Sequence, residues 1–250
     1  MFVNYNSRFV DIFKTMILFS LLITESSPNV LPCGRSRQAS HCCGLDSLTW
    51  HYWFLTAVGK SPRENVKKSF ELAQKALSMD ESDSMTHALL GSLYLFMRKY
   101  DKAIAEGERS IELEPNGAIL HCLLGMTLAF SDRLDEAIAH LKQAIRLNPF
   151  PAFWYYANLG QSYMQKGEYE KALKIYEKGL QSNPEAFMTY IHLAVLYVLM
   201  GRKEDGRVAA KKVLELHPSF SLKRVSKALP FKNRDFFRLF VGALREAGLE

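Results

Sequence analysis

The chain has 250 residues, of which 48% are apolar and 23% are charged, and its formal net charge is +6. This composition is typical of a globular chain and supplies enough apolar material for a continuous core. The basic excess lies entirely after residue 200, where twelve Lys or Arg stand against six Asp or Glu. A basic end can favour an acidic partner, an anionic membrane or nucleic acid, but we expect a solvated capping helix here.

The four cysteines do not form a common zinc or disulfide framework. No C-x-x-C pair occurs, and the run His41-Cys42-Cys43 lacks the spacing of zinc ligands. Cys33 lies nearby in the same N-terminal segment, whereas Cys122 lies inside a helical pattern. We therefore expect no structural metal and no disulfide scaffold.

The first 49 residues differ in character from the remainder of the chain. An apolar, uncharged run at residues 15–24 follows Arg8 and Lys14, an order that is similar to a signal peptide. The run is shorter than the ~20 apolar residues that a membrane-spanning helix needs. We expect a poorly ordered extension in a cytoplasmic protein, with export or membrane attachment through residues 8–27 as the alternative.

From residue 84 onward the sequence repeats with a period of 34 residues. Gly91 and Gly125 are 34 residues apart, and the same spacing separates Pro115 from Pro149. This period is typical of helix–turn–helix units that stack on one another. The predicted units are 84–117, 118–151, 153–186 and 187–220, with Ala152 inserted before the third and a degraded unit at 50–83.

The residue types at fixed positions of these units resemble the tetratricopeptide repeat (TPR). Each unit has Leu-Gly or Leu-Ala in its first helix, and a proline follows the second helix. Small residues let the two helices approach closely, and proline ends the second helix. The resemblance implies an all-α, right-handed superhelical solenoid of antiparallel hairpins. Because Gly206 replaces the usual alanine, we expect the second helix of the fourth unit to be the weakest.

The segments that flank the secure units also have helical patterns. Ser61, Pro62 and Glu64 form an N-cap, a first-turn proline and a capping-box residue, which predict a helix over 62–79. After the last unit, residues 221–250 are expected to form a basic capping helix. Its predicted apolar stripe comprises Phe236, Phe237, Leu239, Phe240, Leu244 and Leu249.

In TPR arrays the first helix of each unit lines a concave groove, so the resemblance predicts a partner-binding groove here. Its predicted residues are mainly apolar and include methionine, which adapts to varied apolar surfaces. They are Met85, Ser92, Phe96, Ile119, Met126, Phe130, Trp154, Gln161, Gln165 and Met188. We expect a peptide or helix of a protein partner, unless the C-terminal helix or the N-terminal segment fills the groove.

Other ligands and activities fit this sequence less well. The Lys, Asn and Arg clamp of TPR proteins that hold chaperone C-termini is absent from the groove positions, and no phosphate-loop, serine-hydrolase or zinc-protease motif occurs. His87, His121 and His192 lie on first helices near packed positions, where a structural role is expected. We therefore predict a non-enzyme without cofactor, metal, small-molecule substrate or nucleic-acid partner.

Two segments are similar to bacterial class III adenylate cyclases that carry C-terminal TPR arrays. They are the tail, with ALPFKN at 228–233 and LREAGL at 244–249, and residues 147–155, LNPFPAFWY. The resemblance covers roughly residues 65–250 and implies a regulatory or assembly array in signal transduction. It transfers no catalytic residue, because no cyclase domain is present in residues 1–64. A detached regulatory arm of a cyclase system is therefore the alternative function.

Overall fold

The computed structural model describes residues 62–250. The possible signal or anchor segment at 8–27, the first helix of the degraded unit and three of the four cysteines lie outside the described residues. Within the described part, eleven helices and no strand are present. The chain is therefore all-α over this range, as the repeat pattern predicts.

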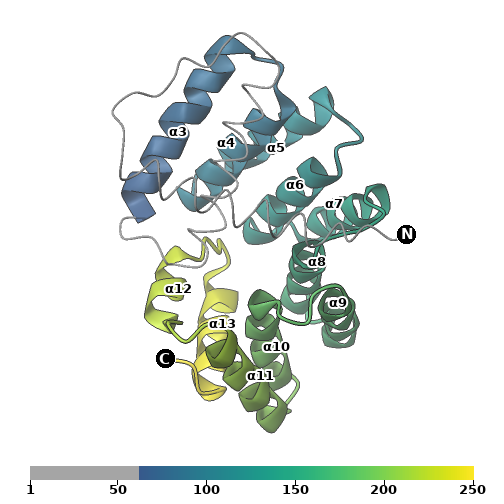
Figure 1. Cartoon of the computed structure of the whole chain (residues 1–250), viewed down its shortest axis with the longest axis vertical. Helices are drawn as coiled ribbons and strands as arrows, with labels where there is room; N and C mark the ends of the chain where they lie inside the picture. Colours follow the sequence, from purple (N-terminus) through teal and green to yellow (C-terminus); the bar gives the residue numbers. More distant parts are fainter. Residues whose placement is uncertain (1–61) are drawn as a thin grey trace, which may run out of the picture. The chain divides into compact units, whose positions relative to one another are not determined.

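Four helical hairpins follow one another along the chain (Figure 1). The helix α3 (Pro62–Met79) precedes them and packs against the first helix of the first hairpin. The hairpins pair α4 (Ser84–Phe96) with α5 (Tyr100–Leu113), α6 (Ala118–Phe130) with α7 (Leu134–Leu147), α8 (Phe153–Gln165) with α9 (Tyr169–Ser182), and α10 (Phe187–Leu199) with α11 (Lys203–Leu216).

The first helices α4, α6, α8 and α10 also contact one another in series and form an inner layer. A continuous apolar core runs through this layer and includes Leu124, Leu141, Tyr176 and Leu196, each almost completely buried. The stacking buries apolar surface that one hairpin alone leaves in water. We call the side of the layer that carries the predicted groove positions the first-helix face.

Each hairpin has at least one glycine that lies against its other helix. A Cβ atom on Gly91 would lie 2.8 Å from the carbonyl oxygen of Ala103 on the facing helix. In the fourth hairpin, Ala194 occupies the position of Gly91, and Gly206 takes over from the second helix: its Cβ would lie 3.2 Å from the Ala194 oxygen. The glycine expected to weaken α11 is thus located at the closest contact of its hairpin.

The turns between the two helices of each hairpin share one backbone geometry. Each includes a residue with positive φ: Arg98 (57°), Asp132 (68°), Gly167 (77°) and Gly201 (77°). The following residue donates its amide to a carbonyl near the end of the first helix, as Lys99 does to Tyr94. Glycine adopts this conformation freely, whereas other residues incur a cost of about 1 kcal/mol.

The capping segment consists of two helices, α12 (Leu222–Ala228) and α13 (Arg234–Glu246), rather than the single helix expected. Pro230 explains the difference, because proline removes a helical hydrogen bond and forces the residue before it into extended conformation. Leu229 is indeed extended, with ψ of 120°. Asn233 is the N-cap of α13, and its side chain accepts a hydrogen bond from the Phe236 amide.

The α13 helix packs against α10 and covers the end of the stack (Figure 1). Of the predicted stripe, Phe236, Phe240, Leu244 and Leu249 are buried and Phe237 is half-buried. Leu239 is 47% exposed, so its inclusion in the buried stripe is wrong. The stripe is otherwise the surface with which this helix caps the core.

Candidate functional site

The predicted groove positions lie on the first-helix face, but they differ in exposure. Four of them, Ser92, Met126, Phe130 and Gln161, are buried. The other six are half-buried: Met85, Phe96, Ile119, Trp154, Gln165 and Met188. The accessible part of the predicted site is therefore smaller than the sequence pattern suggests.

The half-buried positions include one residue at the same place in every unit. Met85, Ile119, Trp154 and Met188 each stand second in their unit, in the first turn of α4, α6, α8 and α10. Met85, Ile119 and Trp154 pack partly on the core. We call these four residues the apolar row.

The capping segment, by contrast, reaches Phe130. The Phe231 ring lies 4.7 Å from the Phe130 ring, centroid to centroid, and the Lys232 amide donates to the Phe130 carbonyl oxygen at 2.9 Å. At this position the C-terminal segment fills the predicted groove. The sequence left this outcome open and offered the C-terminal helix or the N-terminal segment as the occupant, whereas at Phe130 the occupant is the loop before α13.

Two residues of the first hairpin also hold this loop. The Arg98 guanidinium donates to the Leu229 carbonyl oxygen at 3.0 Å, and the Tyr100 hydroxyl donates to the Pro230 carbonyl oxygen at 3.2 Å. In the second hairpin, the Asp132 carboxylate accepts a hydrogen bond from the side-chain amide of Asn233 at 3.3 Å. Sequence patterns did not predict a role for Arg98, Tyr100 and Asp132, although the absence of turn glycine at 98 and 132 was a visible signal.

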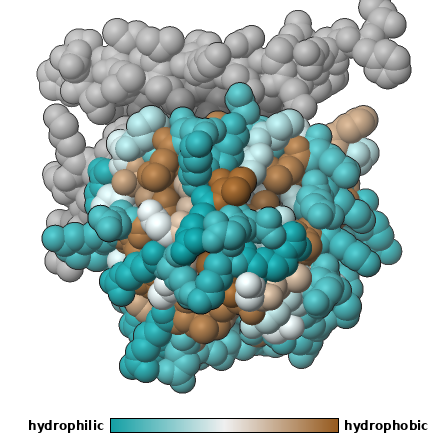
Figure 2. Space-filling view, turned by 90° about the horizontal axis from the view of Figure 1, so that it is seen from below, coloured by the Kyte–Doolittle hydropathy of each residue, from teal (hydrophilic) through white to brown (hydrophobic). Residues whose placement is uncertain are grey.

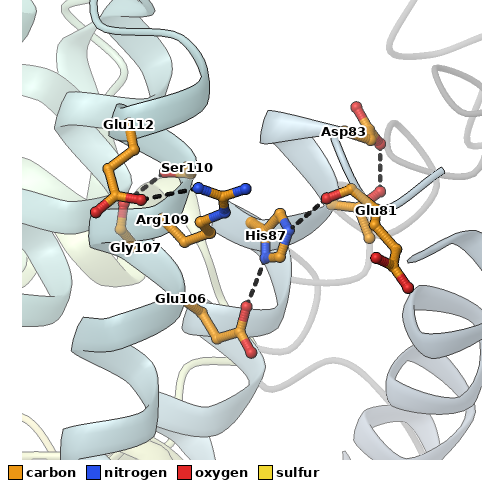
Figure 3. A network of polar contacts seen from close by, with 9 residues as sticks. Glu81, Asp83, His87, Glu106, Gly107, Arg109, Ser110 and Glu112 are labelled. Atoms are coloured by element: carbon orange, nitrogen blue, oxygen red, sulfur yellow. Dashed lines mark hydrogen bonds and ion pairs between the residues drawn. The ribbon is translucent and has the colours of Figure 1, made fainter. Parts of the chain in front are cut away.

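Two of the three histidines on the first helices, His87 and His121, have hydrogen-bond partners. His87 lies between two acceptors, with Nε2 3.1 Å from the Glu81 carbonyl oxygen and Nδ1 2.7 Å from a Glu106 carboxylate oxygen (Figure 3). At the equivalent place in later units, His121 Nε2 lies 2.9 Å from the Pro115 carbonyl and the Tyr190 hydroxyl lies 3.0 Å from the Pro184 carbonyl. In these three units, this position satisfies a carbonyl at the end of the preceding segment.

His121 has a second partner in His140, with the two Nδ1 atoms 2.9 Å apart. Since the Pro115 carbonyl can only accept, His121 donates from Nε2, and His140 therefore donates from Nδ1 in the neutral pair. Burial and the neighbouring His121 lower the pKa of His140. His121 thus uses both of its ring nitrogens in hydrogen bonds, which fits a structural role.

A small cavity lies between α10 and the capping segment. It is lined by Met188, Ile191, His192, His217, Arg224 and Phe240, among others. His192 is almost completely buried, and its Nδ1 atom has no hydrogen-bond partner within the described part of the chain. Burial lowers its pKa to about 4. The neutral ring is thus the stable form, and it packs against the rings of Tyr176 and Phe240.

Metal-binding and membrane-spanning features are absent from residues 62–250. No group of three or more His, Cys, Asp or Glu in this range could hold a metal ion, and none of its helices has the length and apolarity to cross a bilayer. Cys122 is a free thiol in the core, and burial raises its pKa. A thiol held in its protonated form is a poor nucleophile.

Comparison with known proteins identifies the repeat. Two family models, both described as tetratricopeptide repeat, match residues 88–152 and 153–185. A comparison with curated protein sequences gave no significant match. Neither the matching family models nor the structures named below link the chain to nucleotide cyclases.

Several solved structures are similar in fold. PilW, a widely conserved type IV pilus biogenesis factor, is 15% identical with a TM-score of 0.63, over 85% of this chain and 90% of that one. TTC0263, a thermophilic TPR protein of Thermus thermophilus, is 19% identical with a TM-score of 0.61, over 82% and 99%. MamA of Desulfovibrio magneticus RS-1 is 17% identical with a TM-score of 0.53, over 75% and 98%.

At these identities the likeness to solved structures concerns the fold alone. Together with the matching family models and the paired helices, it shows that the chain contains tetratricopeptide repeats and folds as a TPR solenoid with a C-terminal helical cap.

Proposed function

We propose that the chain is a protein-interaction scaffold that binds a peptide or a helix along the first-helix face. The observation that carries this proposal is the apolar row, because it places one half-buried apolar side chain per unit at matching positions. An amphipathic helix or an extended peptide offers a complementary series of apolar side chains at regular spacing. Two of the four residues are methionines, which adapt to differently shaped partners.

The surface chemistry favours a protein partner over the other classes of ligand. On the face drawn in Figure 2, brown hydrophobic patches lie between teal hydrophilic ones. The apolar row carries no charge, whereas nucleic-acid binding would need basic or base-stacking positions that recur along it. We propose no cofactor, small-molecule substrate or catalytic role, since the described histidines and the core cysteine serve packing and hydrogen bonding.

Substitution of the apolar row tests the proposal. Tagged full chains carrying Ile119→Asp or Trp154→Asp are compared with the unchanged chain in pull-downs followed by mass spectrometry. We expect both variants to lose the same specific partner, because an aspartate in the row must be desolvated against an apolar ligand. Phe130 is unsuitable for this test, since it is 4% exposed and packs on Phe231.

Val208→Asp supplies the matched control, because Val208 is an apolar residue on the second helix α11 and is 69% exposed. This variant should keep the partner that the row variants lose. If all three variants capture the same proteins while circular dichroism shows each to be folded, the first-helix face is not the binding surface. The regulatory role beside a cyclase remains a hypothesis that no observation on the structure favours.

A further inference from the structure

The turns of the first two hairpins hold non-glycine residues where those of the last two hold glycine. All four turns have the same positive-φ residue and the same amide-to-carbonyl hydrogen bond. Arg98 and Asp132 therefore adopt a conformation that is costly for a residue with a side chain, less so for Asp than for Arg, whereas Gly167 and Gly201 adopt it without that cost. Strained residues of this kind persist where the side chain contributes something that glycine cannot.

Both of these side chains contact the same short segment. Arg98 donates to the carbonyl oxygen of Leu229, and Asp132 accepts from the side chain of Asn233. The two residues are 34 positions apart in equivalent turns, and together they bind the two ends of residues 229–233. We call Arg98, Tyr100, Phe130 and Asp132 the turn site.

Most of the contacts made by the turn site are to the backbone of this segment. Arg98 and Tyr100 bind the carbonyl oxygens of two consecutive residues, and the Phe130 carbonyl accepts the Lys232 amide. Groups that bind the main chain recognise an extended peptide with little regard for its sequence. Pro230 suits this mode, because it has no amide to satisfy and favours an extended backbone.

Two side chains of the segment supply selectivity. Phe231 is fully buried, with its ring tilted against that of Phe130 and close to three phenylalanine rings of α13. The Lys232 ammonium lies 5.7 Å from the centre of the Tyr100 ring. A buried aromatic anchor followed by a cation over a second ring is a compact recognition pattern. The turn site therefore fits an extended segment of the type Pro-aromatic-basic.

The internal segment does not satisfy the turn site completely. Arg98 engages Leu229 through Nη2, while its Nη1 atom is buried and has no hydrogen-bond partner among residues 62–250. A guanidinium group can hold two acceptors side by side, but one carbonyl offers a single oxygen here. A ligand that supplies a second acceptor would bind this site better than residues 229–233 do.

We propose that the turn site is a peptide-recognition site that the chain's own residues 229–233 occupy as an internal ligand. An extended partner segment with proline, an aromatic residue and a basic residue in this order displaces it. The inference rests on the proposed function as a scaffold and names a partner class for it. Arg98 and Asp132 then serve peptide recognition, because the turn itself forms equally well with glycine.

A labelled peptide tests the site. The probe is fluorescein-labelled Lys-Ala-Leu-Pro-Phe-Lys-Asn-Arg, which copies residues 227–234, and binding to full-length chains is followed by fluorescence anisotropy. We expect weak binding to the unchanged chain and at least about tenfold tighter binding to Phe231→Ala, in which the internal ligand lacks its anchor. Adding Arg98→Gly and Asp132→Gly to Phe231→Ala should abolish the gain.

A second measurement does not depend on the Phe231 variant remaining folded. In chains with only Arg98→Gly and Asp132→Gly, hydrogen exchange of the Lys232 amide should quicken by about tenfold, because the segment opens more often. Amides in the middle of α6 should keep their protection. Arg133→Ala is the matched control, since Arg133 lies next to Asp132 but pairs with Glu136 and Glu108.

The proposal is overturned if the peptide binds Phe231→Ala no better than the unchanged chain, or if the glycine substitutions leave both peptide binding and Lys232 exchange unaltered. A concentration-dependent dimer that these substitutions abolish would also overturn it, in favour of segment exchange between two copies. If Trp154→Asp abolishes partner binding in the pull-down but the peptide does not bind Phe231→Ala, only this inference is refuted. The scaffold function would stand in that case.

Discussion

Gly91 shows how a single hydrogen atom sets the distance between two helices. Its position faces the backbone of α5, so a methyl group there would meet the Ala103 carbonyl oxygen, which cannot rotate away. In the fourth hairpin the small pair is reversed, with Ala194 on the first helix and Gly206 on the second. Each contact therefore has at least one glycine, and either helix can supply it.

Gly91→Ala should lower the free energy of unfolding by about 1–3 kcal/mol, because the added methyl group forces the hairpin apart. Gly242→Ala is the matched control: Gly242 lies in the exposed part of α13, and its Cβ would meet nothing within 4 Å. There the change should raise stability by about 0.5–1 kcal/mol through helix propensity. Urea unfolding of both variants checks the pair, and a stabilising Gly91→Ala would contradict the close contact.

His192 should make stability depend on pH. Its pKa is about 4 in the folded chain and 6.5 in the absence of burial. Between these values the unfolded chain binds a proton that the folded chain does not, so stability falls as pH decreases from about 6.5 to about 4 and is unaffected above that window. The full loss from this residue is about 3 kcal/mol.

His192→Phe removes this titration and keeps a ring against Tyr176 and Phe240. Urea unfolding at pH 7.5 and at pH 4.5 should show a smaller acid loss for the variant than for the unchanged chain. His140, whose pKa is also lowered, and the carboxylates contribute equally to both chains. Parallel losses in the two chains would mean that His192 is solvated or partnered in the folded state.

At the scale of helices, periodicity predicts the four hairpins well because each unit repeats the same packing problem. The turn between α7 and α8 contains the inserted residue Ala152 and leaves Phe150 88% exposed, so the insertion lengthens a loop without disturbing the stack. The cap has no repeat to guide it. The stripe from Phe236 to Leu249 predicts α13, whereas the break at Pro230 was visible in the sequence but outweighed by the pattern.

The site was less predictable than the helices, for a physical reason. The position of a residue in a repeat predicts the direction of its side chain. Its exposure also depends on the segment that packs over it, and here that segment lies about 100 residues later in the chain. Phe130 is the example: it occupies a groove position, and Phe231 buries it. The contacts of Arg98 and Asp132 with the same segment likewise join parts of the chain that no local pattern relates.

Asn233 connects the cap to the turn site and can separate their contributions. Its side chain accepts from the Phe236 amide at the start of α13 and donates to Asp132. Asn233→Ala should cost about 1 kcal/mol of stability, because the helix loses its N-cap. Asn233→Ser keeps a capping oxygen and should recover most of that loss in thermal unfolding.

Exchange of the Lys232 amide distinguishes the second role of Asn233. The serine variant lacks the reach to Asp132, so this amide should exchange faster even where global stability is restored. Equal destabilisation by alanine and serine would contradict the capping role. Unchanged exchange in both variants would show that Asp132 does not hold the segment.

For the whole molecule, the decisive property is how the stack ends. A repeat array buries each unit against the next, so its last unit exposes an apolar face unless another element covers it. Here α13 covers α10, with Phe240 against His192 and Lys203 paired to Glu246 at 2.5 Å. The basic residues of the capping segment point outward, which keeps this end of the stack solvated.

A chain that ends at Phe220 should therefore self-associate. Removal of α12 and α13 uncovers Ile191, His192 and Val195 on α10, which are buried in the full chain. Apolar surface of this extent on the last unit offers a second copy the same packing that α13 provides. Light scattering after size-exclusion chromatography gives the molar mass of each chain. At the same concentration, the truncated chain should contain more copies per particle than the full chain. A truncated chain of unchanged association state and helical content would mean that the four hairpins close their own core and that the cap exists mainly to present residues 229–233 to the turn site.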